Sequence, residues 1–304
     1  TVKTRILILS DTHGRKPHYT PQGLNGDTDR PLTSGFRFPL PEADVAIHCG
    51  DLTSNSNLQE FEATFSMLRD LSAPLKLVIA GNHDVALDRQ HWDPMVKKTD
   101  TLPAPLVERY KRCPDEVQRV VDAARQDGVI YLPSDGVYDF DLANGAHLRV
   151  FASPMTPEYG SWAFQYPRGG HKFDIPAGID VVVSHGPPRN VLDNTIHAGN
   201  AGCDDLFAAV CASRPKIHCF GHIHEGWGAE LVTWKPPSSS PPVQKVAQAT
   251  IARFYEDKCV PVDVTVAGAL PLRPGEQTLF INAAIMDVRY RPRNVPWLVD
   301  IDLP

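Results

Sequence analysis

Histidine, aspartate and asparagine recur in five short clusters along the chain, and their side chains are of types that bind metal ions. Each cluster directly follows a short apolar run of the kind that forms strands, at residues 5–9, 45–47, 77–80, 180–183 and 217–220. Strands that end at one edge of a sheet deliver the loops after them to that edge. We therefore expect a metal site built from the clusters Asp11-Thr12-His13, Gly50-Asp51, Gly81-Asn82-His83-Asp84, Ser184-His185-Gly186 and Gly221-His222-Ile223-His224.

The candidate ligands offer oxygen and nitrogen atoms and no sulfur. They are Asp11, His13, Asp51, Asn82, His185, His222 and His224. This mixture suits Mn, Fe, Zn, Ni or Co and argues against a structural zinc site built from cysteines. So many side chains exceed what one ion takes from a protein while keeping coordination positions open for chemistry. Two divalent or mixed-valence transition-metal ions that share a carboxylate fit better, and such sites catalyse in-line displacements.

The composition is that of an ordinary globular protein, and it excludes several classes. The 304-residue chain is 42% hydrophobic and 22% charged, with a net charge of −6, and its pI is near 6.0. This acidic balance argues against nucleic-acid binding through a broad basic face. No apolar run approaches the roughly 18–20 residues that span a bilayer, and the first residues lack a signal-peptide pattern. We expect a cytoplasmic protein without a membrane segment, whose scattered cysteines are reduced.

The order of the predicted elements indicates an α/β fold. Up to residue 81, strands alternate with a helix over residues 57–71, for which Ser56 or Asn57 is available as N-cap. A strand–helix–strand unit of this length favours parallel pairing. Another helix is expected over residues 202–213, and Asn144-Gly145 predicts a hairpin turn. Further strands are expected at residues 129–132, 137–142, 147–152, 180–184, 216–220, 229–233, 278–283 and 297–303.

We expect residues 1–304 to form a single domain of two packed sheets between helices. It carries three insertions, at about residues 15–41, 88–127 and 235–276. The first is predicted to be a long loop. The second has two amphipathic patterns, over residues 105–111 and 114–126, that predict helices. The third opens with a Pro/Ser-rich loop at residues 235–242, followed by a predicted helix over residues 243–255.

Taken in order, the clusters read D-x-H, G-D, G-N-H-D, H-G and G-H-x-H. This series resembles the calcineurin-like metallophosphoesterases over residues 5–227. The resemblance implies two packed mixed β-sheets sandwiched between helices, an αββα arrangement. A second set of motifs is similar to the MPPED-type subfamily, which is related to class III cyclic nucleotide phosphodiesterases: G-D-L-T at 50–53, W-A-F at 162–164, H-G-P-P at 185–188 and F-G-H-I-H-E-G-W-G at 220–228.

The resemblance also implies a role for each residue of the clusters. The ligands divide into a group for each ion and a bridge: Asp11, His13 and His224 for one ion, Asn82, His185 and His222 for the other, and Asp51 between them. His83 is not a ligand in this scheme, and its imidazole protonates or stabilises the leaving-group oxygen. Asp84 either orients that imidazole or has a purely structural capping role.

Three further residues are candidates for substrate binding. Arg168 and Arg189 are candidates to bind phosphate oxygens by bidentate hydrogen bonds. His197 lies in the loop after His185 and is a candidate to enter the pocket. An ordinary surface position is the alternative for each of them.

The leading hypothesis is a dinuclear metal-dependent hydrolase that cleaves a phosphoester bond of a small molecule by means of a metal-bridging hydroxide. The subfamily resemblance favours phosphodiesters, including cyclic nucleotides, with Mn, Fe or Zn as the ions. Two alternatives stay open. One is a dimetal enzyme that hydrolyses a C–O or C–C bond of a non-phosphate metabolite, and the other is a nucleotide-binding protein with vestigial catalysis. The sequence leaves the number of subunits open.

Overall fold

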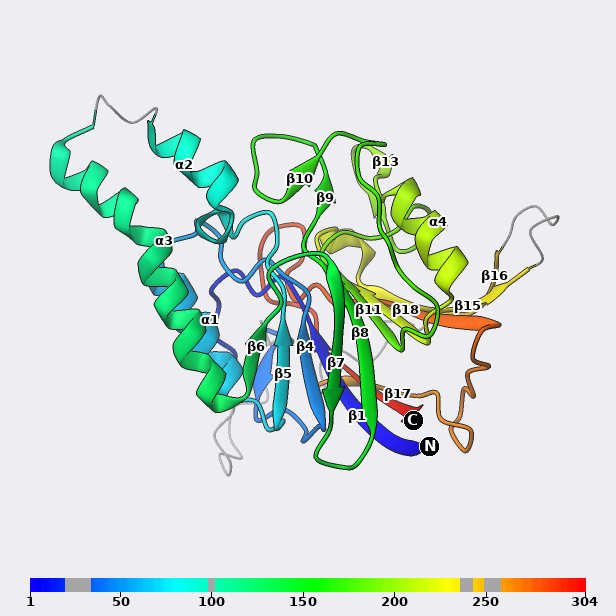
Figure 1. Cartoon of the computed structure of the whole chain (residues 1–304). Coiled ribbons are helices and arrows are strands. Elements are labelled where there is room, and N and C mark those ends of the chain that lie inside the picture. Colours follow the sequence, from blue (N-terminus) through cyan, green and yellow to red (C-terminus); the bar gives the residue numbers. More distant parts are fainter. Residues whose placement is uncertain (20–33, 98–101, 236–242, 249–257) are drawn as a thin grey trace, which may run out of the picture.

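The computed structural model describes residues 1–19, 34–97, 102–235, 243–248 and 258–304. In this part of the chain two β-sheets lie face to face between helices (Figure 1). The first sheet has the strand order β17 (Val260–Asp263), β19 (Trp297–Leu303), β1 (Val2–Leu9), β4 (Val45–His48), β5 (Leu75–Val78) and β6 (Val129–Tyr131). The second has the order β16 (Val243–Gln248), β15 (Gly228–Trp234), β18 (Gln277–Asn282), β14 (Ile217–Phe220), β11 (Val181–Ser184), β8 (His147–Ser153) and β7 (Gly136–Asp141).

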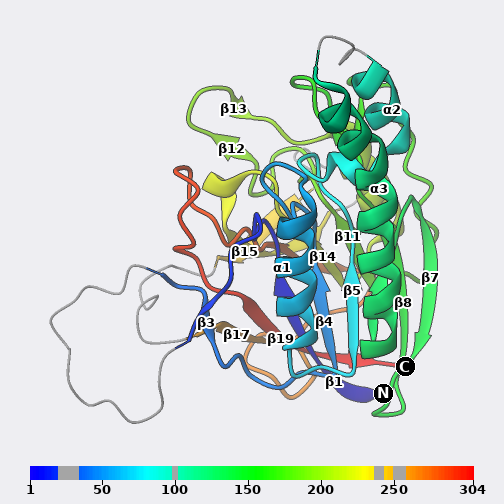
Figure 2. The same ribbon diagram turned by 90° about the vertical axis from the view of Figure 1, so that its left-hand side faces the viewer.

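Strand β1 shows why the layers pack as they do. Successive side chains of a strand point to opposite faces, so Ile6 and Ile8 join the apolar core between the sheets. Leu7 and Leu9 join a second core beneath α1 (Leu58–Arg69) and α3 (Ala104–Ala124), which cover the first sheet (Figure 2). α4 (Asp204–Ser213) covers the second sheet (Figure 1). The predicted αββα arrangement is confirmed.

Parallel pairing brings the strands that precede the clusters to one edge of the molecule. β1, β4 and β5 run parallel in the first sheet, as do β11 and β14 in the second. The sheets are joined at this edge, where Ser10 N donates to Ala283 O at 3.0 Å and Ile285 N donates to Ser10 O at 2.9 Å. We call this junction of Ser10, Ala283 and Ile285 the seam. The loops that carry the clusters begin on both sides of it.

Helix α1 begins after Asn57, as predicted. The Asn57 side chain accepts a hydrogen bond from Glu60 N at 3.0 Å, and the Glu60 carboxylate accepts one from Asn57 N, which forms a capping box. Phe61 and Phe65 then anchor the helix in the core under the first sheet. The cap fixes where the loop from Asp51 ends.

The helical insertion contains α2 (Arg89–Lys97) and α3, and α3 differs from the prediction. The sequence indicated two helices that meet at Pro114, but one helix continues through that residue. Proline has no N–H, so the Tyr110 carbonyl one turn earlier loses its helical partner. The indole Nε1 of Trp92 in α2 donates to that carbonyl at 3.2 Å. A tertiary contact therefore replaces the missing helical hydrogen bond.

The predicted helix over residues 243–255 is wrong where the structure describes it. Residues 243–248 form β16, which pairs antiparallel with β15. The edge of β15 offers unpaired main-chain groups, and pairing with them outweighs a weak helical pattern. Residues 236–242 of the predicted loop and 249–255 of the predicted helix lie outside the described residues.

Short elements complete the fold. The first insertion forms β2 (His18–Tyr19) and β3 (Arg37–Phe38), and residues 20–33 lie outside the described part. The others are β9 (Thr156–Pro157), β10 (Gln165–Tyr166), β12 (Asn194–Thr195), β13 (Gly199–Asn200) and the 3₁₀ turns η1 (Val85–Leu87), η2 (Arg125–Asp127) and η3 (His224–Gly226). Among the described helices none combines the length and the apolar character needed to cross a bilayer.

Candidate metal centre

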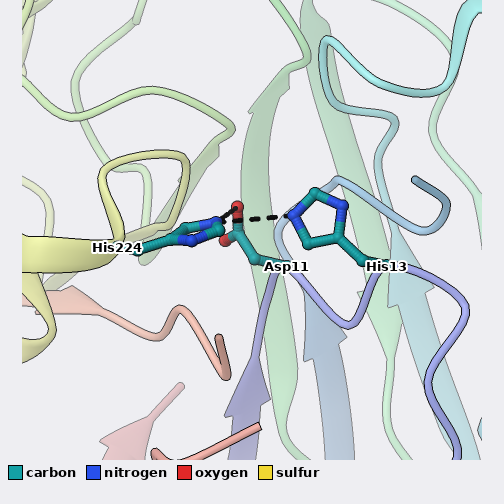
Figure 3. A group of neighbouring side chains, drawn as sticks. All are labelled: Asp11, His13 and His224. Carbon is teal, nitrogen blue, oxygen red and sulfur yellow. Dashed lines mark hydrogen bonds and ion pairs between the residues drawn. The ribbon is translucent and has the colours of Figure 1, made fainter. Parts of the chain in front are cut away.

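The five clusters meet beside the seam, where three groups of ligand-type side chains form. The first group is Asp11, His13 and His224, and Figure 3 shows their side chains pointing toward one another. His224 Nε2 lies 3.3 Å from Asp11 Oδ1 and 3.4 Å from His13 Nε2. Two imidazole nitrogens this close cannot both carry a hydrogen toward each other, so the arrangement suits a shared cation.

The second group is Asp51, His185 and His222, and the third is His13, Asp51 and His83. The two carboxylate oxygens of Asp51 face different partners. Oδ1 lies 3.3 Å from His185 Nε2, and Oδ2 lies 3.6 Å from His13 Nε2. Asp51 therefore stands between the first and second groups, in the position of a bridge.

Asn82 lies beside the second group. Its Oδ1 is 3.0 Å from His185 Nε2. An amide oxygen contributes a donor without adding negative charge, so Asn82 completes a set of two imidazoles, one carboxylate and one amide.

The far nitrogen of three of the histidines is held by the main chain. Nδ1 of His13 is 2.9 Å from Thr53 O, and Nδ1 of His185 is 2.9 Å from Cys49 O. Nδ1 of His224 is likewise 3.1 Å from Asp287 O. A carbonyl can only accept, so each Nδ1 donates, and each Nε2 is the ring atom left to bind a metal ion once any proton on it is displaced. The donor set and its tautomers fit divalent metal ions.

Electrostatics favours the ligand-competent forms of the acids. Burial raises the pKa of Asp11, but His224 and His185 lower it to about 2. Burial also opposes ionisation of Asp51, yet His185 and His13 hold its pKa well below the usual range. Burial lowers the pKa of His222 to about 3, so this imidazole is neutral. For His185 burial is outweighed by Asp51, which raises the pKa to about 9. An ion bound there displaces that proton.

Four of the ligand positions have backbone strain. A positive φ, between 48° and 67°, is found at Asp11, His13, Asp51 and His222. Residues with a Cβ rarely adopt this left-handed region, and such strain gathers at functional sites. At Gly221 the constraint is steric: a Cβ there would overlap the Asp11 carboxylate and the Ser10 hydroxyl. The glycine thus allows the loop after β14 to approach the loop after β1.

The structure gives His83 and Asp84 different surroundings. His83 N donates to Asp51 Oδ1 at 2.9 Å, and its Nδ1 is held 2.8 Å from Ser54 O. The Asp84 carboxylate does not contact that ring. It accepts hydrogen bonds from Gly81 N at 2.8 Å and from Leu52 N and Thr53 N at 3.0 Å, and from the Thr53 hydroxyl at 2.8 Å. These contacts favour the capping role for Asp84.

The three predicted substrate residues lie in separate settings. The Arg168 guanidinium donates to Ala201 O at 2.8 Å and to Gly202 O at 3.1 Å, so it supports a loop. Arg189 is half-buried. His197 is exposed between β12 and β13. This hairpin reaches the metal side, because Ile196 N donates to Glu225, the residue after His224, at 3.2 Å.

Aromatic side chains that the sequence analysis did not assign to the site surround the clusters. The Trp162 ring packs against that of His83 with 4.2 Å between centroids and a tilt of 36° between the ring planes. The Tyr290 ring lies 4.9 Å from that of His13 and 5.1 Å from that of His224. Asn82 Nδ2 donates to the hydroxyl of Tyr159 at 3.0 Å. Trp162 belongs to the W-A-F motif, whereas no sequence signal marks either tyrosine.

Comparison with known proteins gives a consistent picture. The family model described as calcineurin-like phosphoesterase matches residues 4–226, which include all five clusters. Metallophosphoesterase domain-containing protein 1 of Homo sapiens is 28% identical over 307 residues, covering 99% of this chain and 72% of that protein. Probable rhamnogalacturonate lyase C of Emericella nidulans is 34% identical over 234 residues. That match covers 76% of this chain, which spans only 18% of the relative's length.

The family match and the ligand clusters together support divalent metal ions as the cofactor. The predicted resemblance to MPPED-type proteins is confirmed by the human relative. Fold, motif order and family model agree: the chain belongs to the calcineurin-like phosphoesterase family.

Proposed function

We propose that this chain is a dinuclear metal-dependent hydrolase of phosphodiesters, including cyclic nucleotides, that uses Mn, Fe or Zn ions. One observation carries the proposal: the ligand groups are continuous, because His13 and Asp51 each belong to two of them. Shared members support two neighbouring cation positions, which an in-line displacement at phosphorus uses. Ions bound there supply Lewis acidity and an activated water molecule.

The residues of the chain hold and orient the reacting groups. Asp51 would hold both ions, because its two carboxylate oxygens face different partners. His83 is held through its main-chain N–H and its Nδ1, which leaves Nε2 for the leaving-group oxygen. In the imidazolium form, in which Nδ1 and Nε2 both carry hydrogen, Nε2 donates a proton to the leaving alkoxide or stabilises its charge.

The surroundings of Arg168 favour diesters over monoesters. Its guanidinium already donates to two main-chain carbonyls, so the charge of the substrate is left to the cations. A diester carries one negative charge and a monoester carries up to two near neutral pH. A bound diester therefore needs fewer positively charged side chains of the protein to balance its charge.

Turnover of bis-p-nitrophenyl phosphate tests the proposal. The protein is stripped of ions and reloaded with Mn, Fe or Zn in turn, and we expect hydrolysis with a pair of ions bound per chain. No phosphoester hydrolysis with any of Mn, Fe, Zn, Ni or Co would contradict the proposal. Turnover of a non-phosphate ester alone would instead favour the other dimetal reaction.

Two histidine variants distinguish a metal ligand, His222, from the proposed general acid, His83. His222→Ala is expected to lose an ion together with activity, because its imidazole belongs to the second group. His83→Ala should keep both ions and lose roughly 10²–10⁴ in kcat, the usual contribution of a general acid. Metal analysis and steady-state kinetics measure both effects, with the exposed His147→Ala as control.

The third ligand group makes this test decisive, because His83 there accompanies His13 and Asp51. Loss of an ion from His83→Ala would show that His83 is a ligand, and the acid role would then be wrong.

A further inference from the structure

Asn82 differs from the other candidate ligands because its side chain ends in two unlike atoms. Oδ1 can bind a metal ion, whereas Nδ2 carries two hydrogens and cannot. A carboxylate has no such wrong orientation, because both of its outer atoms are oxygens. Asn82 is fully buried, and a buried N–H group without an acceptor is costly. An Asn82 ligand therefore needs an acceptor that holds Nδ2 on the side away from the ion.

The hydroxyl of Tyr159 is such an acceptor. Asn82 Nδ2 donates to it at 3.0 Å, while Asn82 Oδ1 lies 3.0 Å from His185 Nε2 on the metal side. Among the described residues Nδ2 makes no other hydrogen bond. The Tyr159 ring also meets the ring of His222 edge-on, with 5.2 Å between the centroids. Tyr159 thus contacts two of the residues assigned to the second ion.

The loop that carries Tyr159 is held in place by the main chain. It runs between β9 and β10, which pair with each other, and Glu158 N donates to Tyr166 O at 2.8 Å across its ends. Ala163 N, in the same loop, donates to Asn82 O at 3.2 Å. Asn82 is therefore bound by this loop at its main chain and at its side chain.

Tyr290, the other tyrosine beside the clusters, makes different contacts. Its ring lies beside His13 and His224, which belong to the first group. Its hydroxyl lies 3.5 Å from His83 Nε2, and among the described residues it makes no hydrogen bond to a candidate ligand. The two tyrosines therefore allow a matched comparison, because each offers one hydroxyl to the centre and only that of Tyr159 binds a ligand side chain.

We propose that Tyr159 is a positioning residue of the metal centre: its hydroxyl holds the Asn82 amide with Oδ1 toward the second ion and thereby raises the affinity for that ion alone. A partner that orients a metal ligand typically contributes about 10- to 100-fold in metal affinity. The inference rests on the two-ion centre of the proposed function. It deepens that function by naming a residue outside the five clusters that controls how firmly one ion is held.

Titration calorimetry of the ion-free full chain with Mn tests this role. The wild type should bind two ions. Tyr159→Phe keeps the ring beside His222 and loses the hydroxyl, so it should bind one ion about 10- to 100-fold more weakly and the other with unchanged affinity. Tyr290→Phe is the matched control and should change neither affinity. Unchanged affinities in Tyr159→Phe, or an equal loss for both ions, would overturn the proposal.

A second comparison shows whether Tyr159 acts through Asn82. Asn82→Ala still has Asp51, His185 and His222 around the second ion, and Zn is used for this comparison because it binds such ligands more tightly than Mn. Once the amide is gone, adding Tyr159→Phe should have no further effect on either Zn affinity. The same loss with and without the amide would show that Tyr159 acts independently of Asn82, and the positioning role would then be wrong.

Hydrolysis of bis-p-nitrophenyl phosphate at increasing Mn concentration separates this role from the proposed reaction. Tyr159→Phe should need more Mn and then reach the kcat of the wild type, because a positioning residue does not touch the substrate. A lowered kcat with unchanged ion affinities would assign the hydroxyl to the substrate instead and overturn the proposal. If the wild type hydrolyses no phosphoester but Tyr159→Phe loses affinity for one ion, the positioning role stands and the reaction is wrong. If the wild type is active and Tyr159→Phe binds both ions equally well, the reaction stands and the positioning role is wrong.

Discussion

At the scale of single residues, Asp84 shows a motif carboxylate that serves the loops rather than the reaction. Asp84→Ala leaves the main-chain N–H groups of Gly81, Leu52 and Thr53 without their acceptor. An unpaired buried donor costs roughly 1–3 kcal/mol, so the free energy of unfolding should fall by about 3 kcal/mol or more. Urea denaturation of the metal-loaded protein measures this, with the exposed Asp93→Ala as control.

A different outcome would revive the other role of Asp84. If the variant keeps its stability and loses kcat, the carboxylate orients His83, and the hydrogen bonds to the loops are incidental.

Which site residues the sequence could predict depends on how far each lies from a strand end. The candidate ligand Asp11 comes two residues after β1, and His185 directly follows β11, so residue type and spacing were enough to bring both into the predicted ligand groups. Tyr290 was missed because its loop carries no motif. Its hydroxyl lies 3.5 Å from His83 Nε2 only because the chain folds back across both sheets.

At the scale of elements, α2 and α3 depend on one hydrogen bond between them. Trp92→Phe removes the donor that satisfies the Tyr110 carbonyl opposite Pro114, and we expect a loss of about 1–2 kcal/mol in the free energy of unfolding. In a Pro114→Ala background the helix regains its own N–H donor, so the same change should cost less. A double-mutant cycle by urea denaturation measures the difference. Equal costs in both backgrounds would contradict this account.

The errors in the predicted elements have a common cause. Pro114 carries a local signal for a helix start, and residues 243–248 carry a weak helical pattern. Contacts from distant segments override both: an indole from α2 in the first case and the edge of β15 in the second. Strand β19 had the predicted bounds, because its alternate residues from Trp297 to Leu303 are apolar and face the core between the sheets.

At the scale of the whole molecule, acid should weaken the pairing of β1 with β19. Arg5 Nε and Nη2 donate to the Asp300 carboxylate at 2.7 and 2.9 Å. This hydrogen bond, against the effect of burial, lowers the pKa of Asp300 below its ordinary value of 3.8. The folded-state pKa is below the unfolded one, so the stabilisation is present above about pH 4 and is lost as the pH falls through the folded-state value.

Urea denaturation of the wild type and of Arg5→Gln between pH 6 and pH 2.5 tests this. The wild type should be more stable by roughly 1 kcal/mol near pH 6, and the difference should shrink below pH 4. Arg273→Gln breaks a pair whose side chains are more than half exposed, and it should not show this pH-dependent difference. A constant difference for Arg5→Gln at all pH values would contradict the assignment to Asp300.

The seam has a consequence for how the two layers of the protein hold together. Asp11, Asp51 and Asn82 come from loops of the first sheet, whereas His185, His222 and His224 come from loops of the second. Ions bound by both sets would hold the two layers together, because without them the Asp11 and Asp51 carboxylates repel each other. Loss of the ions would therefore lower both the catalytic activity and the stability of the contact between the two sheets. Evolutionary selection for a tighter metal centre would also favour a protein whose two layers separate less easily.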